Sequence, residues 1–281
     1  MARKIWVHGP ISLDSIVHVD RVPLAGGFVR STASEKRVGG SGANIAFGLA
    51  TTGIPTCFIT WVGSDELAST LKQRISESLL TASVVKEFDG LSGEVAVLID
   101  RDGERTIIGL SPSRLEDLHI DGATLEPGDI VVFTLWRHSF LPDLIKAQGL
   151  GCTVIVGAQA LDDPTIPSAD LVIGSIHDYS GKSLSGLGAK FPRIVLSNGA
   201  AGADEYNGTE QIHVGAVTAT SIDATGAGDA FIAGYIASYF HGLPSARSLE
   251  IGALWGAAAV ETRASIPPHF DEIRRRGAIE F

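Results

Sequence analysis

A glycine-rich segment that carries a carboxylate lies just before a long apolar pattern. It reads Asp-Ala-Thr-Gly-Ala-Gly-Asp over residues 223–229, and the apolar residues that follow recur every three or four positions, which predicts a helix that begins here. Because the first amides of a helix lack internal partners, those of Gly226, Ala227 and Gly228 can bind an anion. Asp229 is then suited to accept a proton from a hydroxyl group that attacks phosphorus. An ordinary helix start, with Asp229 favourable to the helix dipole, fits the segment equally well.

A second glycine-rich run lies near the N-terminus and leads into another predicted helix. Small residues at Gly39 and Gly40 let a ligand approach the backbone closely. Asn44 offers a donor and an acceptor in the first helical turn, which suits a polyhydroxylated ligand. Asp14 follows the first predicted strand, where ligands of doubly wound sheets bind, and its carboxylate can accept two hydroxyl groups of a sugar. Singly, Asp14 also fits a turn residue and Asn44 a helix cap.

Composition and charge narrow the class of protein. A chain of 281 residues fits one large α/β domain over residues 1–281, and its 22 basic and 32 acidic residues leave a formal net charge of -10. That charge favours solubility and argues against a nucleic-acid partner. Cys57 and Cys152 lie in apolar stretches away from other metal-binding side chains, which is typical of reduced thiols in a cytoplasmic protein. We see no signal peptide and no apolar run of about 18 residues, so we expect no membrane partner.

Short apolar runs rich in β-branched residues recur along the chain, with helical patterns between most of them. This alternation predicts an α/β fold with a doubly wound parallel sheet that is covered by helices on both faces. The expected strands are residues 5–7, 57–62, 130–133, 154–156, 171–173 and 194–196. The expected helices are residues 43–52, 66–80, 139–148, 226–242 and 245–262.

Two segments, residues 11–38 and 91–110, interrupt this alternation with strand patterns. Within the second, residues 95–99 and 105–108 are joined by a polar turn at residues 100–104, which is a hairpin signal. We expect the two insertions to form an antiparallel β-sheet lid that covers a ligand and excludes water. The alternative is an edge hairpin without a function.

Taken together, the two glycine-rich segments resemble the two signature regions of the ribokinase (PfkB) family of carbohydrate kinases, in order and in separation. Further similar segments are the first strand with Asp14, and residues 61–65, 103–108 and 197–202. The resemblance implies a ribokinase-like, Rossmann-type and mostly parallel sheet with a small β-sheet lid. It also implies a kinase that uses ATP and Mg²⁺ to transfer the γ-phosphoryl group to a sugar hydroxyl, and a homodimer that forms through the lid.

The resemblance further implies roles for individual residues. Asp229 would be the base that activates the acceptor hydroxyl, and the amides of residues 226–228 would stabilise the transferring phosphoryl group. The residues expected to hold the sugar are Asp14, Gly39, Gly40 and Asn44. The residues expected to contact the nucleotide are Ser197, Gly199, Gly202, Ala257 and Ala258.

The chain departs from the family pattern at positions that handle ions. Where the family has Asn-x-x-Glu, which organises magnesium and its waters, this chain has Ser-Ile-His-Asp at residues 175–178. Asp178 can still accept a magnesium-bound water. Asp223 matches a carboxylate that binds a monovalent cation in many members, but the loop after Arg263 is shorter than usual and Ala224 replaces a hydroxyl residue. The resemblance therefore leaves activation by K⁺ open.

Residues 59–63 and 135–138 are similar to branches of the family that act on modified ketohexoses, such as fructosamine-type kinases. Arg137 follows a predicted strand, and a guanidinium there could bind a carboxylate, sulfonate or phosphate on the sugar, although a surface Arg-His pair fits as well. We expect a sugar kinase that phosphorylates a primary hydroxyl. The alternatives are a nucleoside kinase of the same fold, and a catalytically weak protein that binds a sugar or nucleotide.

Overall fold

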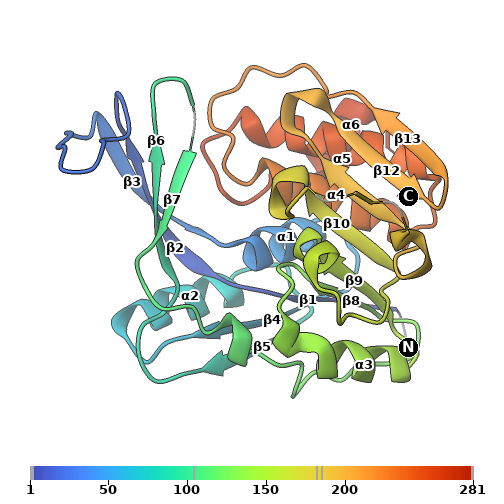
Figure 1. Ribbon diagram of the computed structural model, residues 1–281. Helices are drawn as coiled ribbons and strands as arrows, with labels where there is room; N and C mark the ends of the chain where they lie inside the picture. Colours follow the sequence, from blue (N-terminus) through green and yellow to red (C-terminus); the bar gives the residue numbers. More distant parts are fainter. Residues whose placement is uncertain (1–2, 104, 182, 185, 280–281) are drawn as a thin grey trace.

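A long, mostly parallel sheet forms the body of the molecule (Figure 1). The computed structural model describes residues 3–103, 105–181, 183–184 and 186–279. Within these residues the strands of the large sheet are β1 (Ile5–His8), β4 (Thr56–Val62), β5 (Ala82–Glu87), β8 (Ile130–Phe133), β9 (Thr153–Gly157), β10 (Leu171–Ser175), β11 (Ile194–Ser197), β12 (Ala203–Asn207) and β13 (Glu210–Val214). They lie in the order β13-β12-β11-β10-β9-β8-β1-β4-β5.

The strand order places β1 at the point where the direction of the winding changes. From β1 the chain first builds outward through β4 and β5, and it then returns to the other side of β1 to add β8, β9, β10 and β11, all in parallel. Only β12 and β13 run antiparallel to their neighbours. Ligands of such sheets bind beyond the carboxyl ends of the strands near this switch point. The predicted strands and their parallel arrangement are confirmed.

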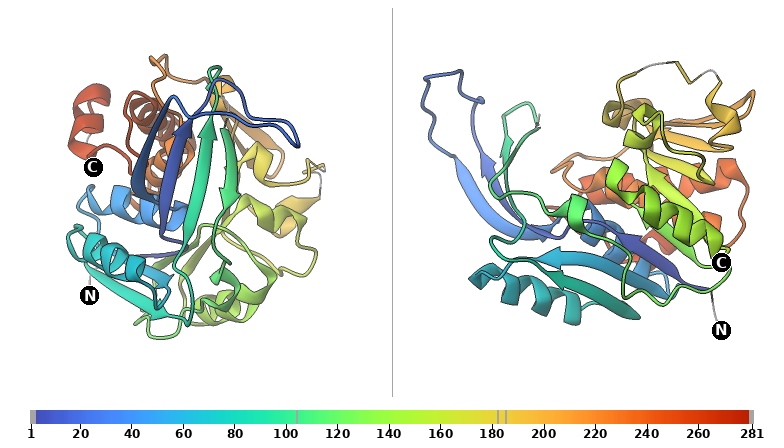
Figure 2. Two further views of the ribbon diagram at one scale, coloured as in Figure 1. Left: turned by 90° about the vertical axis from the view of Figure 1, so that its left-hand side faces the viewer. Right: turned by 60° about the horizontal axis from the view of Figure 1, so that its bottom comes forward.

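Helices cover both faces of this sheet, as Figures 1 and 2 show. Because side chains alternate along a strand, Ile5 and Val7 of β1 enter one apolar cluster and Trp6 enters the other. The first cluster packs under α1, α2, α4, α5 and α6, and the second packs under α3. The bounds of the helices are α1 (Ser41–Ala50), α2 (Glu66–Ser76), α3 (Leu141–Gly149), α4 (Ala227–Phe240), α5 (Ser245–Val260) and α6 (Phe270–Gly277).

A smaller sheet stands away from one end of the body and forms the lid (Figure 2). Its strands are β2 (Ser12–His18), β3 (Ala33–Gly39), β6 (Glu94–Ile99) and β7 (Arg105–Gly109), in the order β3-β2-β6-β7. The predicted hairpin of β6 and β7 is present, and Glu104 of its turn lies outside the described residues. The expectation of an antiparallel lid is wrong for one pair, because β2 and β6 are parallel. Both strands leave parallel strands of the body at the same edge, so they run in the same direction.

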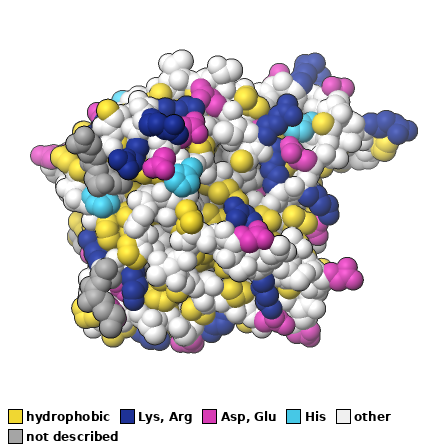
Figure 3. Space-filling model, turned by 180° about the vertical axis from the view of Figure 1, so that it is seen from behind, with side chains coloured by type: hydrophobic (Ala, Val, Ile, Leu, Met, Phe, Trp, Pro, Cys, Tyr) yellow, Lys and Arg dark blue, Asp and Glu magenta, His cyan; other side chains and the backbone are white. Residues whose placement is uncertain are grey.

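The described part of the chain contains no helix of the length and apolar character that crossing a bilayer requires. Both cysteines are free and buried. On the face that Figure 3 shows, basic and acidic side chains are interspersed.

Candidate active site

The two glycine-rich segments, which are far apart in the sequence, meet at the starts of two packed helices. Gly40 precedes α1 and Gly226 precedes α4, and both have the positive φ that favours glycine, 94° and 79°. Asn44 in the first turn of α1 donates from Nδ2 to Oδ2 of Asp229 in the first turn of α4, over 2.7 Å. The sequence assigned Asn44 to the sugar and Asp229 to the base, and the structure joins them directly.

The surroundings of Asp229 favour a proton-accepting carboxylate. Burial raises the pKa of Asp229 to about 6, and the negative charges of Asp14 and Asp178 act in the same direction. The hydrogen bond from Asn44 and the charge of Arg105 oppose this rise. A carboxylate with this pKa is ionised at neutral pH and is a stronger base than an ordinary aspartate.

We predict that kcat/KM falls about tenfold per pH unit below a pH of about 6, because only ionised Asp229 accepts a proton. The Asn44 hydrogen bond favours the ionised form, so Asn44→Ala should move this acid limb to higher pH. Asp14→Asn removes a neighbouring negative charge and should move the limb to lower pH. Rate profiles of the three proteins test this, and shifts of the two variants in the same direction would contradict it.

The backbone at the start of α4 offers amides to an anion. The Ala227 amide lies 3.3 Å from the carbonyl oxygen of Ala224, so it is already engaged within its own turn. Within the described residues, no acceptor is found for the amides of Gly226 and Gly228. Position 226 also has no room for a larger residue, because a Cβ atom there would lie 2.1 Å from the carbonyl oxygen of Ser265.

Asp14 lies beside the same helix starts, on β2 of the lid. Its side chain is buried, and Oδ1 accepts a hydrogen bond of 2.7 Å from the Ser12 hydroxyl. A Cβ atom at Gly39 would lie 2.0 Å from Oδ2 of Asp14, so only glycine leaves room for this carboxylate. Burial raises the pKa of Asp14, although the Ser12 hydrogen bond and the charge of Arg37 oppose the rise. Asp14, Gly39, Gly40 and Asn44 are therefore brought together as expected for one ligand site.

Asn44 has a polar atom left over for such a ligand. Its Oδ1 is buried and has no hydrogen-bond partner among the residues that the structure describes. A buried acceptor without a partner is costly, and a sugar hydroxyl would satisfy it. The amide nitrogen of Asn44 thus holds the carboxylate of Asp229, while its oxygen stays available to a ligand.

The residues expected at the nucleotide lie at the carboxyl end of β11 and on α5. Ser197 donates from Oγ to the carbonyl oxygen of Gly174 over 3.3 Å. Gly199 and Gly202 form the turn into β12, where Gly202 has a φ of 92° and a Cβ atom would lie 2.2 Å from the carbonyl oxygen of Val214. On α5, Ala257 is partly exposed. Ala258 is completely buried in the core, so the structure does not support a direct nucleotide contact for its side chain.

Asp178 is an exposed carboxylate just after β10. Its Oδ2 accepts a hydrogen bond of 2.9 Å from the backbone N–H of Ser175, and its negative charge contributes to the raised pKa of Asp229. The described residues contain no group of three or more metal-binding side chains. Mg²⁺ in kinases is held by phosphates, waters and few carboxylates, so Asp178 fits a site of that kind.

Arg137 lies just after β8, and its guanidinium donates to the carbonyl oxygen of Trp136 over 2.8 Å. The contacts found for the described residues do not join it to Asp14, Asn44 or Asp229. Its role in holding an anionic group of the substrate therefore stays a prediction.

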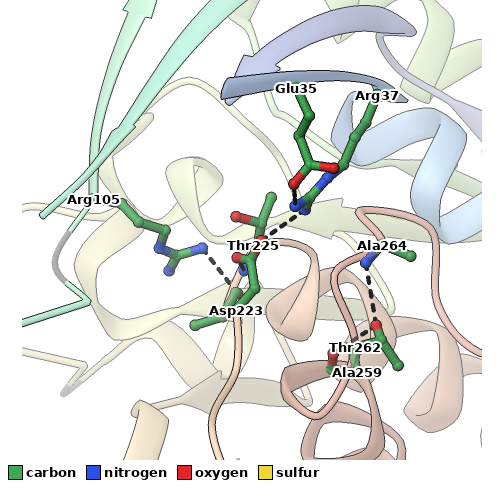
Figure 4. A network of polar contacts seen from close by, with 9 residues as sticks. Glu35, Arg37, Arg105, Asp223, Thr225, Ala259, Thr262 and Ala264 are labelled. Carbon is green, nitrogen blue, oxygen red and sulfur yellow. Dashed lines mark hydrogen bonds and ion pairs between the residues drawn. The ribbon is translucent and has the colours of Figure 1, made fainter. Parts of the chain in front are cut away.

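Two arginines of the lid reach the segment before α4, and the sequence did not single them out. Figure 4 shows Arg37 of β3 and Arg105 of β7 pointing toward residues 223–225. Arg37 Nη1 lies 2.7 Å from Oδ2 of Asp223, and Arg105 Nη1 donates to the carbonyl oxygen of Ala224 over 2.9 Å. Arg37 stands in the polar run Ser-Glu-Lys-Arg, which has the composition of an ordinary exposed strand.

The carboxylate of Asp223, which was expected to bind a monovalent cation, is held by the guanidinium of Arg37 and by the backbone. Its Oδ1 accepts a hydrogen bond of 2.8 Å from the N–H of Thr225. Burial would raise the pKa of Asp223, but the hydrogen bonds from Thr225 and Arg37 outweigh it and lower the pKa below its ordinary value. Asp223 is therefore an ionised partner of Arg37.

A small lid sheet beside a doubly wound core, with a carboxylate at a glycine-rich helix start and amides that have no acceptor among the described residues, is typical of a phosphotransferase that acts on a hydroxyl group. The chain belongs to the pfkB family of carbohydrate kinases, whose family model matches residues 3–153 and 177–271. This finding confirms the resemblance that the motifs indicate.

Proteins similar to this chain act on several acceptors. Fructoselysine 6-kinase of Escherichia coli (strain K12) is 25% identical over 238 residues, which cover 79% of this chain and 89% of that protein. An ATP-dependent ribose-1-phosphate kinase of Halopiger xanaduensis is 27% identical over 276 residues, 90% of each chain. The structure of Burkholderia thailandensis nucleoside kinase in complex with inosine has a TM-score of 0.80 at 19% identity, over 98% of this chain and 96% of that one, which shows that the two chains share a fold. Membership of the family makes the protein a carbohydrate kinase of the pfkB family.

Proposed function

We propose that this protein is an ATP-dependent kinase that transfers the γ-phosphoryl group to a primary hydroxyl of a sugar or modified ketohexose. The observation that carries the proposal is the contact between Asn44 and Asp229, which brings a sugar-binding amide to the base at the anion-binding helix start. A base that touches the residue expected to hold the acceptor can reach that acceptor's hydroxyl.

In the proposed reaction, the acceptor oxygen attacks the γ-phosphorus while its proton passes to the ionised carboxylate of Asp229. The bond between the γ-phosphorus and the bridging oxygen breaks, and ADP carries that oxygen away. The amides of Gly226 and Gly228 face the charge that gathers on the transferring group, because they have no acceptor among the described residues. Asp14 fixes the acceptor by its hydroxyl groups, and bound Mg²⁺ would neutralise phosphate charge with Asp178 accepting from its waters.

A modified ketohexose is favoured by two features. The similar fructoselysine 6-kinase is named for an acceptor of that class. Arg137 follows β8 and Asp14 follows β1, so both residues come after the carboxyl ends of two neighbouring parallel strands. The guanidinium of Arg137 suits an anionic group on the sugar. A nucleoside also presents a primary hydroxyl beside a diol, and the fold is shared with a nucleoside kinase.

Release of ADP tests the proposal directly. The protein would be incubated with ATP, Mg²⁺ and a panel of ketohexoses, their amino-acid and anionic derivatives, aldopentoses and nucleosides. Turnover of a ketohexose or its derivative supports the proposal, and turnover of nucleosides alone would replace it with the nucleoside kinase alternative. If no acceptor is phosphorylated while a sugar raises the melting temperature, the protein binds sugars without acting as a kinase.

We also propose that the lid forms a homodimer. Strand β7 is an edge strand whose residues are all exposed, including Ile107 at 64% and Ile108 at 47%. An exposed apolar edge strand is normally covered, and a second copy of the lid would cover it. We predict a mass of two chains in light scattering, and a mass of one chain for Ile107→Lys together with Ile108→Glu. A monomeric wild-type protein would contradict the proposal.

A further inference from the structure

A buried ion pair connects the lid to the segment that carries the anion-binding amides. Arg37 of β3 and Asp223 are 186 positions apart in the sequence, and their side chains are only 9% and 3% exposed. The distance of 2.7 Å between Nη1 and Oδ2 is that of a charge-assisted hydrogen bond. A carboxylate this deeply buried needs a positive partner, because removing one member of such a pair leaves an uncompensated charge.

The ion pair involves the first residue of the turn at residues 223–226, which we call the anion-binding turn. Asp223 accepts a hydrogen bond from the N–H of Thr225, and the next residue is Gly226, whose amide has no acceptor within the described part of the chain. A second lid strand contacts the same turn, since Arg105 of β7 donates to Ala224 (Figure 4). Two opposite edges of the lid sheet therefore hold one short turn, and moving the lid away would release both contacts.

The strand register of the lid sheet places Arg37 on the same face as Asp14, which is the face toward the candidate active site. Arg37 lies opposite Asp14 in the ladder between β2 and β3, and directly opposed side chains share a face. Its neighbour Lys36 points to the other face, where it is 64% exposed and lies 3.6 Å from Glu94. The two adjacent basic residues thus lie on opposite faces of the lid.

We propose that Arg37 is a positioning residue that supplies, as a fixed part of the lid, the positive charge that Asp223 requires. The anion-binding turn then adopts its conformation without a dissolved monovalent cation. It does so only while the lid is in contact with the turn. The proposal rests on the proposed kinase function. With Oδ2 occupied by the guanidinium and Oδ1 by the Thr225 amide, like-charge repulsion disfavours a second cation at this carboxylate.

Space for a small cation opens when Arg37 is shortened. A surface pocket of about 370 Å³ adjoins Arg37, and its other polar lining residues are Glu35, Arg74, Arg263 and Ser265. Removal of the guanidinium would leave Asp223 without a positive partner beside this pocket. A guanidinium ion or K⁺ supplied in solution is then able to take the vacated place.

The test is cation rescue of Arg37→Met, with Lys36→Met as the matched control. We expect Arg37→Met to lose about 10²-fold in kcat, because the turn is misplaced, with a smaller change in the KM for the acceptor. Guanidinium chloride far below denaturing concentrations, or KCl, should restore several-fold of the lost kcat, compared with choline chloride at equal ionic strength. The wild-type protein and Lys36→Met should show no such activation.

The double variant Arg37→Met/Asp223→Asn separates a positioning charge from simple loss of packing. Glu35, which also pairs with Arg37, can still attract a cation, but it lies on the lid strand and no contact joins it to the turn among the described residues. Without the Asp223 carboxylate, a cation should therefore not restore kcat in the double variant. If it responds to cations as Arg37→Met does, or if the wild-type protein is activated by K⁺, the proposal is overturned.

Melting temperature gives a readout that does not depend on the reaction. Guanidinium or K⁺ should raise the melting temperature of Arg37→Met relative to choline, and should not raise that of the double variant. This response would support the charge replacement even if no acceptor were phosphorylated, so failure of the kinase proposal and failure of this one are distinguishable. Equal melting curves of Arg37→Met in all three salts would contradict it.

Discussion

Asp229→Asn is expected to lower kcat about 10²- to 10⁴-fold, the range that a general base contributes. The amide keeps the size of the carboxylate and an oxygen that can still accept from Asn44 Nδ2, so the helix start should be retained. What is lost is the group that takes the acceptor's proton, and it acts only as the hydroxyl attacks. Steady-state rates of ADP release with the accepted sugar measure the effect.

Nucleotide binding is the internal control for this variant. Because the base makes its contribution in the transition state, the affinity for ATP measured by calorimetry should change little. Asp178→Asn provides a matched carboxylate, since it lies near enough to influence the pKa of Asp229 but is assigned to waters of Mg²⁺. A kcat for Asp229→Asn that equals the wild-type value would refute the assignment of the base.

Gly226→Ala is expected to have the second large effect, on both stability and rate. The residue has a φ of 79°, and a Cβ atom would lie 2.1 Å from the carbonyl oxygen of Ser265. The strained backbone and the overlap together should lower the free energy of unfolding by about 2 to 5 kcal/mol. Displacement of an anion-binding amide should also lower kcat about 10²-fold or more. Urea unfolding and rates of ADP release measure the two effects.

Gly228→Ala is the matched control for stability. It lies two residues further on in the same helix start, where a Cβ atom would meet no heavy atom within 4 Å and φ is not positive. Alanine is a better helix former than glycine, so the free energy of unfolding should change by less than about 1 kcal/mol. Equal destabilisation by both substitutions would show that the contact with Ser265 does not set the requirement for glycine.

The body of the fold could be predicted from sequence wherever strands are buried on both faces. Residues 130–133 were predicted as a strand and form β8 (Ile130–Phe133), because a central parallel strand is a continuous apolar run. Strands β5 and β13 at the sheet edges were missed, since their residues are largely half-buried or exposed and give no such run. Helix α6 was missed because only Phe270 and Ile273 of its residues are buried.

The candidate site was predicted in part for a similar reason. Asp229 and the glycines of α4 form a local pattern, and so do Gly39, Gly40 and the start of α1. The direct contact of Asn44 with Asp229 has no local signal, because 185 positions separate the two residues. It follows from the packing of α1 on α4, which places both first turns side by side.

The sequence by itself determined the helix starts and the central strands, and it singled out Asp229 as the candidate base, because apolar periodicity and glycine-rich turns are properties of neighbouring residues. Only the tertiary structure decided which charges meet. Lys36 and Arg37 are equivalent basic residues in the sequence, yet the pairing of β3 with β2 turns one outward and sets the other against Asp223. Strand register between distant segments selects which side chains share a face, and no local pattern encodes that choice.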